Sequence, residues 1–183
     1  MESLPPSACA RCAAAKGRSC CEAQPGEYLA TLTCADVERI KVATGKAGRF
    51  FCEDEWLSVE EARAYELHRP LYEGYFRHGP RRLTLKTAQG ACVFLNRATG
   101  CGLAEEARPT SCRLYPLEPW PDGSLSVLAG GDAPCLAVDE AADVPALTAA
   151  LGLSPALLAA LTEQLRAEVK DHARRTAASS RAP

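Results

Sequence analysis

This chain of 183 residues has no long apolar run, no excess of basic residues and few histidines. The longest strongly apolar stretches, such as residues 155–161, are far shorter than the ~20 residues that a membrane-spanning helix needs. A net charge of −2 offers no basic face for a nucleic acid. Residues 1–12 lack the basic and then apolar pattern of a secretory signal. We therefore expect a cytoplasmic protein with neither a membrane nor a nucleic acid as its partner.

The sequence also lacks the common catalytic motifs. It has no GxSxG, no HExxH and no complete phosphate-binding loop, because GKAGR at 45–49 lacks the required spacing. The histidines at 68, 78 and 172 are scattered in polar contexts, so we expect them to be exposed rather than to bind metal. Whether the chain is an enzyme stays open, and its catalytic residues are unknown.

Cysteine is abundant instead, with ten in the chain. In a secreted protein this density would indicate disulfides, but in a reducing cytoplasm it points to metal or redox chemistry. The first four lie in the stretch CARCAAAKGRSCC at 9–21. A CxxC pair is a common metal half-site, although alone it also serves thiol–disulfide exchange.

The adjacent residues Cys20 and Cys21 are the most informative part of this stretch. Neighbouring side chains in an extended backbone point to opposite sides. Two such thiolates do not easily bind one ion together. They favour two metal atoms, two sites that share a loop, or one ligand with the other cysteine as its neighbour. The stretch therefore argues against a simple mononuclear zinc finger.

Three further segments accompany the stretch at 9–21. They are LTCADVERI at 32–40, GACVFLNRATGCGLAEEARPTSCRLYP at 90–116 and a last cysteine at 135. Over residues 9–137 the combined pattern resembles the YkgJ-type cysteine-cluster family, described as zinc- or iron-chelating domains with a CxxCxxCC-like signature. The resemblance implies a metal-binding set of eight cysteines, namely Cys9, Cys12, Cys20, Cys21, Cys92, Cys101, Cys112 and Cys135.

Two arginines and two cysteines flank this implied set. A cluster held by four thiolates is negatively charged, so Arg108 and Arg113 are candidates to lie beside it and stabilise it. The alternative for Arg113 is a surface ion pair with Glu105 or Glu106. Cys34 and Cys52 fall outside the pattern, and we interpret both as buried structural residues.

The nature of the metal follows from the all-sulfur donor set. Zinc accepts it as two sites of four thiolates each. Iron–sulfur chemistry accepts it too, and neighbouring thiolates can then reach different iron atoms. The sequence favours an iron–sulfur or other multinuclear iron site, with a structural zinc module as the alternative.

The biochemical role is less defined, and the substrate or protein partner is unknown. The first hypothesis is a metal-binding protein with a binding, electron-transfer or metal-handling role. Some relatives in the resembled family are associated with lysine N-methylation of flagellin, which implies a protein-modifying enzyme as an alternative. A cytosolic thiol–disulfide protein that uses Cys9 and Cys12 is a further one.

We expect an α+β fold with N-terminal helices, a short antiparallel sheet, irregular cysteine loops and C-terminal helices. Thr33 and Ser58 predict helix N-termini, and Gly45 and Pro70 the corresponding ends. Alternating polar and apolar residues predict strands at 82–87, 91–95 and 124–128. Residues 9–27 and 101–121 are expected to be mostly irregular.

The domain boundaries follow from changes in composition. Residues 1–8 are expected to be a flexible lead-in, residues 9–142 the metal-binding domain, residues 143–175 a helical extension and residues 176–183 a disordered tail. The extension has an apolar stripe, which either packs on its own domain or forms a homodimer. The stripe consists of Leu157, Leu158, Leu161, Leu165 and Val169.

Overall fold

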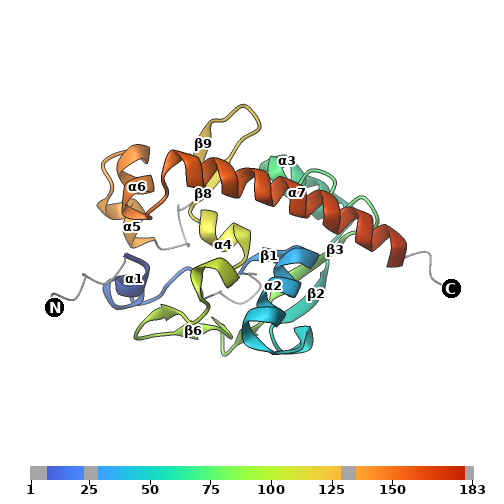
Figure 1. Cartoon of the computed structure of the whole chain (residues 1–183), viewed down its shortest axis with the longest axis horizontal. Coiled ribbons are helices and arrows are strands. Elements are labelled where there is room, and N and C mark those ends of the chain that lie inside the picture. Colours follow the sequence, from blue (N-terminus) through green and yellow to red (C-terminus); the bar gives the residue numbers. More distant parts are fainter. Residues whose placement is uncertain (1–7, 23–28, 129–134, 180–183) are drawn as a thin grey trace.

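The structure is a computed structural model that describes residues 8–22, 29–128 and 135–179, without the side chains of residues 8–10, 13 and 179 (Figure 1). Most of the expected lead-in and residues 180–183 of the expected tail therefore lie outside the described residues. The chain has the expected α+β architecture, with several helices, small antiparallel sheets and a long C-terminal helix.

Two helices begin at the predicted capping residues. Helix α2 (Cys34–Thr44) starts after Thr33, whose hydroxyl accepts the backbone N–H of Asp36 at 3.1 Å. Gly45 ends it with a φ of 66°. Helix α3 (Val59–His68) has the same reciprocal capping box at its start. These local signals specify the helix ends because they satisfy backbone groups that the helix itself leaves unpaired.

The principal sheet has the order β1-β3-β2 and is antiparallel. Its central strand β3 (Arg81–Leu85) was expected, whereas its neighbours β1 (Thr31–Leu32) and β2 (Cys52–Trp56) were not. The expected turn forms at residues 89–90, but it joins only the short strands β4 (Thr87–Ala88) and β5 (Ala91–Cys92), so the strand expected at 91–95 ends at Cys92.

Two segments that were expected to be irregular contain regular structure. Residues 8–16 form helix α1 (Ala8–Lys16), because the alanine-rich sequence ACARCAAAK has a high helix propensity. The segment 101–121 contains a 3₁₀ turn, a short helix and a strand, namely η3 (Glu105–Ala107), α4 (Thr110–Leu114) and β8 (Leu117–Pro119). Strand β8 pairs with β9 (Leu125–Val127), which confirms the predicted strand near 124–128.

Short elements complete the described chain. The hairpin β6 (Leu95–Asn96) and β7 (Gly100–Cys101) precedes η3. The 3₁₀ turns η1 (Gly48–Phe50) and η2 (Pro70–Tyr72) follow α2 and α3. Helices α5 (Leu136–Glu140) and α6 (Val144–Ala150) lead to α7 (Pro155–Ser179), and both of the prolines expected at helix starts lie in first turns.

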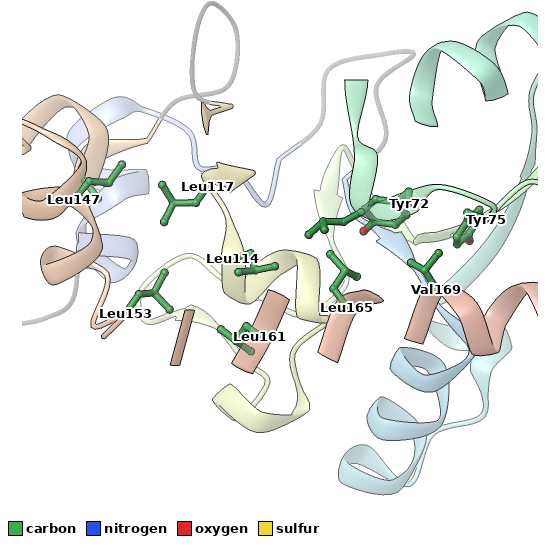
Figure 2. Close-up of a cluster of buried hydrophobic side chains, with 11 residues drawn as sticks. Tyr72, Tyr75, Leu114, Leu117, Leu147, Leu153, Leu161, Leu165 and Val169 are labelled. Atoms are coloured by element: carbon green, nitrogen blue, oxygen red, sulfur yellow. The ribbon is translucent and has the colours of Figure 1, made fainter. Parts of the chain in front are cut away.

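Helix α7 is part of the core rather than an appendage. It runs along one side of the molecule, across α4 and α2 (Figure 1). Figure 2 shows Leu161, Leu165 and Val169 projecting from it into a cluster with Leu114 and Tyr72. The predicted apolar stripe thus packs on its own domain. The buried part of the stripe is already covered by its own chain. A homodimer through this face stays a prediction.

The end of α7 differs from the expected boundary. The helix continues to Ser179, so residues 176–179 are helical and not part of a disordered tail. No single helix among the described residues is long and apolar enough to cross a membrane. Helices α6 and α7 would meet the length and composition criteria only as a pair, and they are bent by 84° relative to each other.

Candidate metal centre

The candidate cysteines are presented by separate elements. Cys9 and Cys12 are one turn apart on α1, and Cys20 and Cys21 follow in a turn. Cys92 ends β5 and Cys101 ends β7. Cys112 lies in α4, and Cys135 immediately precedes α5.

Helices α1 and α5 bring the first and last of these segments together. Arg11 of α1 pairs with Glu140 of α5 through two contacts of 2.9 Å. Lys16 of α1 also forms an ion pair with Asp139 of α5. The consequence is that the segments carrying Cys12 and Cys135 lie close together, although they are far apart in the sequence.

Electrostatics identifies a first group of thiols around Tyr115. Desolvation raises the pKa of the Tyr115 hydroxyl, and the thiols of Cys20, Cys135 and Cys12 raise it further. Desolvation also raises the pKa of Cys135, with a contribution from Cys12. We call Cys12, Cys20 and Cys135 the Tyr115 group. The side chain of Cys9, on the preceding turn of α1, is not among those described.

A second group lies against the sheet side of the molecule. Burial raises the pKa of Cys92 to about 12, and the thiols of Cys21 and Cys101 add to this shift. The Cys92 backbone N–H donates to the Cys21 carbonyl oxygen at 2.7 Å, which ties the turn to β5. We call Cys21, Cys92, Cys101 and Cys112 the Cys112 group.

Cys112 is the exposed member of this group, whereas Cys92 is buried and Cys21 and Cys101 are half-buried. Desolvation raises the pKa of its thiol well above the ordinary value, followed by the effects of Cys21 and Cys92. The residue nevertheless keeps an exposed surface. Both observations fit a sulfur that is surrounded by much protein and still reached by solvent.

The Tyr115 and Cys112 groups meet at the adjacent pair Cys20 and Cys21. The expectation of opposed side chains assumed an extended backbone, and it is wrong here. Residues 19–22 form a turn, closed by a 3.0 Å bond from the Glu22 N–H to the Ser19 carbonyl. The Cys20 thiol donates a hydrogen bond to Cys21 and lowers its pKa. The two sulfurs therefore lie side by side, each adjoining a different group.

The described thiols are gathered in neighbourhoods rather than closed around a point. Within the parts of the chain that the structure describes, no three His, Cys, Asp or Glu side chains converge closely enough to hold a metal ion. Seven of the eight predicted ligands thus fall into the Tyr115 and Cys112 groups, and the eighth, Cys9, has a side chain outside the described ones.

Two orphaned donors test whether a metal–sulfur group suits this place. The Tyr115 hydroxyl and the Arg113 Nε are buried and make no hydrogen bond. A buried polar atom without a partner is costly, and sulfur atoms of a thiolate-bound metal would accept such bonds. The Tyr115 hydroxyl lies among three candidate ligands, and Arg113 follows a fourth. The all-sulfur donor set and these donors fit such a group.

The two predicted arginines differ in their surroundings. Arg108 contributes to lowering the pKa of Cys21, and its Nε donates to the Leu103 carbonyl at 3.2 Å. Arg113 Nη2 lies 3.8 Å from Glu105 Oε1, so the ion pair with Glu105 that was the alternative for Arg113 is present as a long contact. Tyr115 lies in the segment 90–116 that carries the family resemblance, but no role was predicted for it.

The remaining cysteines and histidines lie elsewhere. Cys34 and Cys52 were expected to be buried, but both are only half-buried, because they lie at the start of α2 and on the edge strand β2. His68 and His78 are exposed as expected. His172 was expected to be exposed, but it is only 2% exposed because α7 packs it against the sheet side of the core.

Comparisons with protein-family models, with curated proteins and with solved structures found no match.

Proposed function

We propose that this chain is a metal-binding cysteine-cluster protein, whose eight cysteines hold an iron–sulfur or other multinuclear iron site. The observation that carries the proposal is the position of Cys20 and Cys21. Their sulfurs lie side by side and adjoin two different groups of thiols. A single ion would need only four thiolates, whereas this arrangement offers a continuous set that can serve more than one metal atom.

The chemical character of the donors supports the same proposal. Soft thiolates select iron–sulfur clusters, zinc or copper(I) over hard cations. Tyr115 supplies a hydrogen-bond donor near Cys12, Cys20 and Cys135, and Arg108 supplies positive charge beside Cys21. Such neighbours stabilise a negatively charged cluster and tune its potential. When bound, an iron–sulfur group would supply one-electron transfer or a store of iron.

Purification without oxygen tests the proposal directly. The protein should be brown, should contain iron and, for a sulfide cluster, acid-labile sulfide, and should bleach in air. A colourless protein with about two zinc ions per chain, and no iron after anaerobic reconstitution, would replace iron by a structural zinc module. A protein that retains neither metal under these conditions would overturn the proposal as a whole.

A further inference from the structure

A buried polar network joins α2, α4 and α7 beside the Cys112 group. Asp36 and Thr110 are each 0% exposed, and Glu168 is 8% exposed. Arg39 lies between the two carboxylates, with an ion pair to Asp36 and a 2.7 Å contact to Glu168. Burying charged groups is unfavourable unless they are paired and hydrogen-bonded. The network therefore needs a structural or functional reason for its place.

All of its members meet at Thr110, the first residue of α4. The Thr110 backbone N–H donates to Asp36 Oδ1 at 3.0 Å, and the hydroxyl donates to Glu168 Oε2 at 3.0 Å. The same hydroxyl accepts from Arg39 at 3.1 Å and from Gln164 at 3.2 Å. Thr110 is thus fixed from two other helices at both its backbone and its side chain.

This fixation matters because α4 cannot hold its own position. It has five residues, and its N-cap residue Pro109 makes no side-chain capping bond. A helix this short is unstable by itself. Asp36 takes the place of the missing cap by accepting the first backbone N–H of the helix. The orientation of α4 is therefore set by Asp36 and Glu168.

Helix α4 carries Cys112 two residues after Thr110. Advancing a helix by one residue turns its side chains by about 100° and moves them about 1.5 Å along the axis. Metal–sulfur distances tolerate only about 0.2 Å. A small shift of α4 would therefore remove Cys112 from a metal centre while leaving the other cysteines in place.

We infer that Asp36, Glu168 and Thr110 are positioning residues for Cys112, and that α7 controls the metal centre through them although it carries no candidate ligand. This inference rests on the proposed function. It makes Cys112 the cysteine whose position depends on the network, because the other members of its group lie on the turn, β5 and β7.

The test uses the full chain purified anaerobically with its metal. Thr110→Val removes the side-chain hydroxyl and keeps the side-chain shape, whereas Thr110→Ser keeps the hydroxyl. Glu168→Gln removes the buried charge, and Glu163→Gln is its matched control on the exposed side of α7, where Glu163 pairs with Arg166. The measurements are metal release to excess chelator and iodoacetamide labelling of each cysteine, quantified by peptide mass spectrometry.

In Thr110→Val and Glu168→Gln, we expect the rates of metal release and of Cys112 labelling to rise about 10-fold. Loss of a group that orients a metal ligand typically has an effect of this size. Labelling of Cys12 and Cys135 should rise clearly less than that of Cys112, and Thr110→Ser and Glu163→Gln should resemble the wild type. Should Thr110→Val fail to fold, the isosteric Glu168→Gln variant decides.

Two results would overturn the inference while the proposed function stands. One is wild-type protection of Cys112 in folded variants that keep their metal. The other is equal acceleration at every cysteine, which would mean general loosening of the fold. A wild-type protein that holds no metal, and labels Cys112 as fast as the unfolded chain does, would instead overturn the proposed function and this inference with it.

Discussion

The sulfur of Cys34 lies 3.3 Å from Nδ1 of His172, and the imidazole ring stacks on Tyr75 with 4.1 Å between the ring centroids. Tyr75 is itself held by a 2.7 Å bond from its hydroxyl to the Leu32 carbonyl. Desolvation, with Arg81, lowers the pKa of His172 to about 4, so the ring is neutral at pH 7. Desolvation also raises the pKa of Cys34. The pair is a neutral hydrogen bond in the core, which fits the structural role expected for Cys34.

The first prediction concerns the stability of the fold against pH. His172 has a lower pKa when folded than its unfolded value of about 6.5. The unfolded chain therefore binds more protons between these values, and stability falls as the pH drops from 6.5 towards 4. The full effect is about 3 kcal/mol. Urea unfolding at pH 7.5 and pH 4.5 should show most of this loss in the wild type and a smaller one in His172→Phe.

The control for this prediction is His78→Phe, because His78 is exposed. Metal release at low pH would affect all three proteins alike, so the difference between their curves is the relevant quantity. Parallel pH dependences for the wild type and His172→Phe would contradict the assignment of a buried neutral ring.

The second prediction separates ligand cysteines from structural ones. Metal binding contributes folding free energy, so the loss of a ligand should release metal and loosen the loops. Cys92→Ser and Cys112→Ser should lower both the metal content and the melting temperature. Cys34→Ala and Cys52→Ala should keep the metal, as elemental analysis of the purified proteins would show. If Cys34→Ala empties the site as thoroughly as Cys112→Ser does, the ligand assignment is wrong.

The sequence predicts those parts of the fold whose signals are local. Thr33 and Ser58 bond to backbone groups three residues ahead, so the residues that specify a helix start stand next to it. Strand β2 was missed because CEDEW is rich in acidic residues that disfavour strands, and its pairing with β3 overrides that preference. Tertiary pairing thus decided what local propensity could not.

The arrangement of the site was harder to predict for the same reason. Which cysteines are neighbours depends on the contacts of Arg11 and Lys16 with α5, and these partners are more than a hundred residues away. The geometry of Cys20 and Cys21 depends on a turn rather than on the extended backbone assumed from the sequence. Residue identity predicts a set of thiol donors, but only tertiary contacts define its two groups.

The third prediction measures the contribution of α7 to the core. Leu165 is 3% exposed and packs in the cluster shown in Figure 2. Its replacement by alanine removes buried methyl groups and leaves a cavity, which should cost about 2–5 kcal/mol. Denaturant unfolding measures this loss. Val42 is 86% exposed, so Val42→Ala should change stability by less than about 0.5 kcal/mol. Equal effects of the two changes would contradict the packing of α7.

The last prediction concerns a chain that ends at Asp143. The sequence alone would allow such a chain to keep its metal, because no candidate ligand lies beyond that residue. The structure predicts otherwise. The truncation removes Leu161, Leu165 and Val169, which are at most 3% exposed, and each contributes about 1.5–3 kcal/mol by burial. It also removes Glu168, which holds α4 through Thr110.

The whole fold is expected to be stable by only about 5–15 kcal/mol, so the truncated chain should lose cooperative unfolding and most of its metal. Circular dichroism during heating and elemental analysis would show both losses. The matched control is a chain that ends at Ser179, which keeps all of α7 and should behave as the full chain does. A chain ending at Asp143 that unfolds cooperatively with its full metal content would show that α7 only covers a domain able to fold without it.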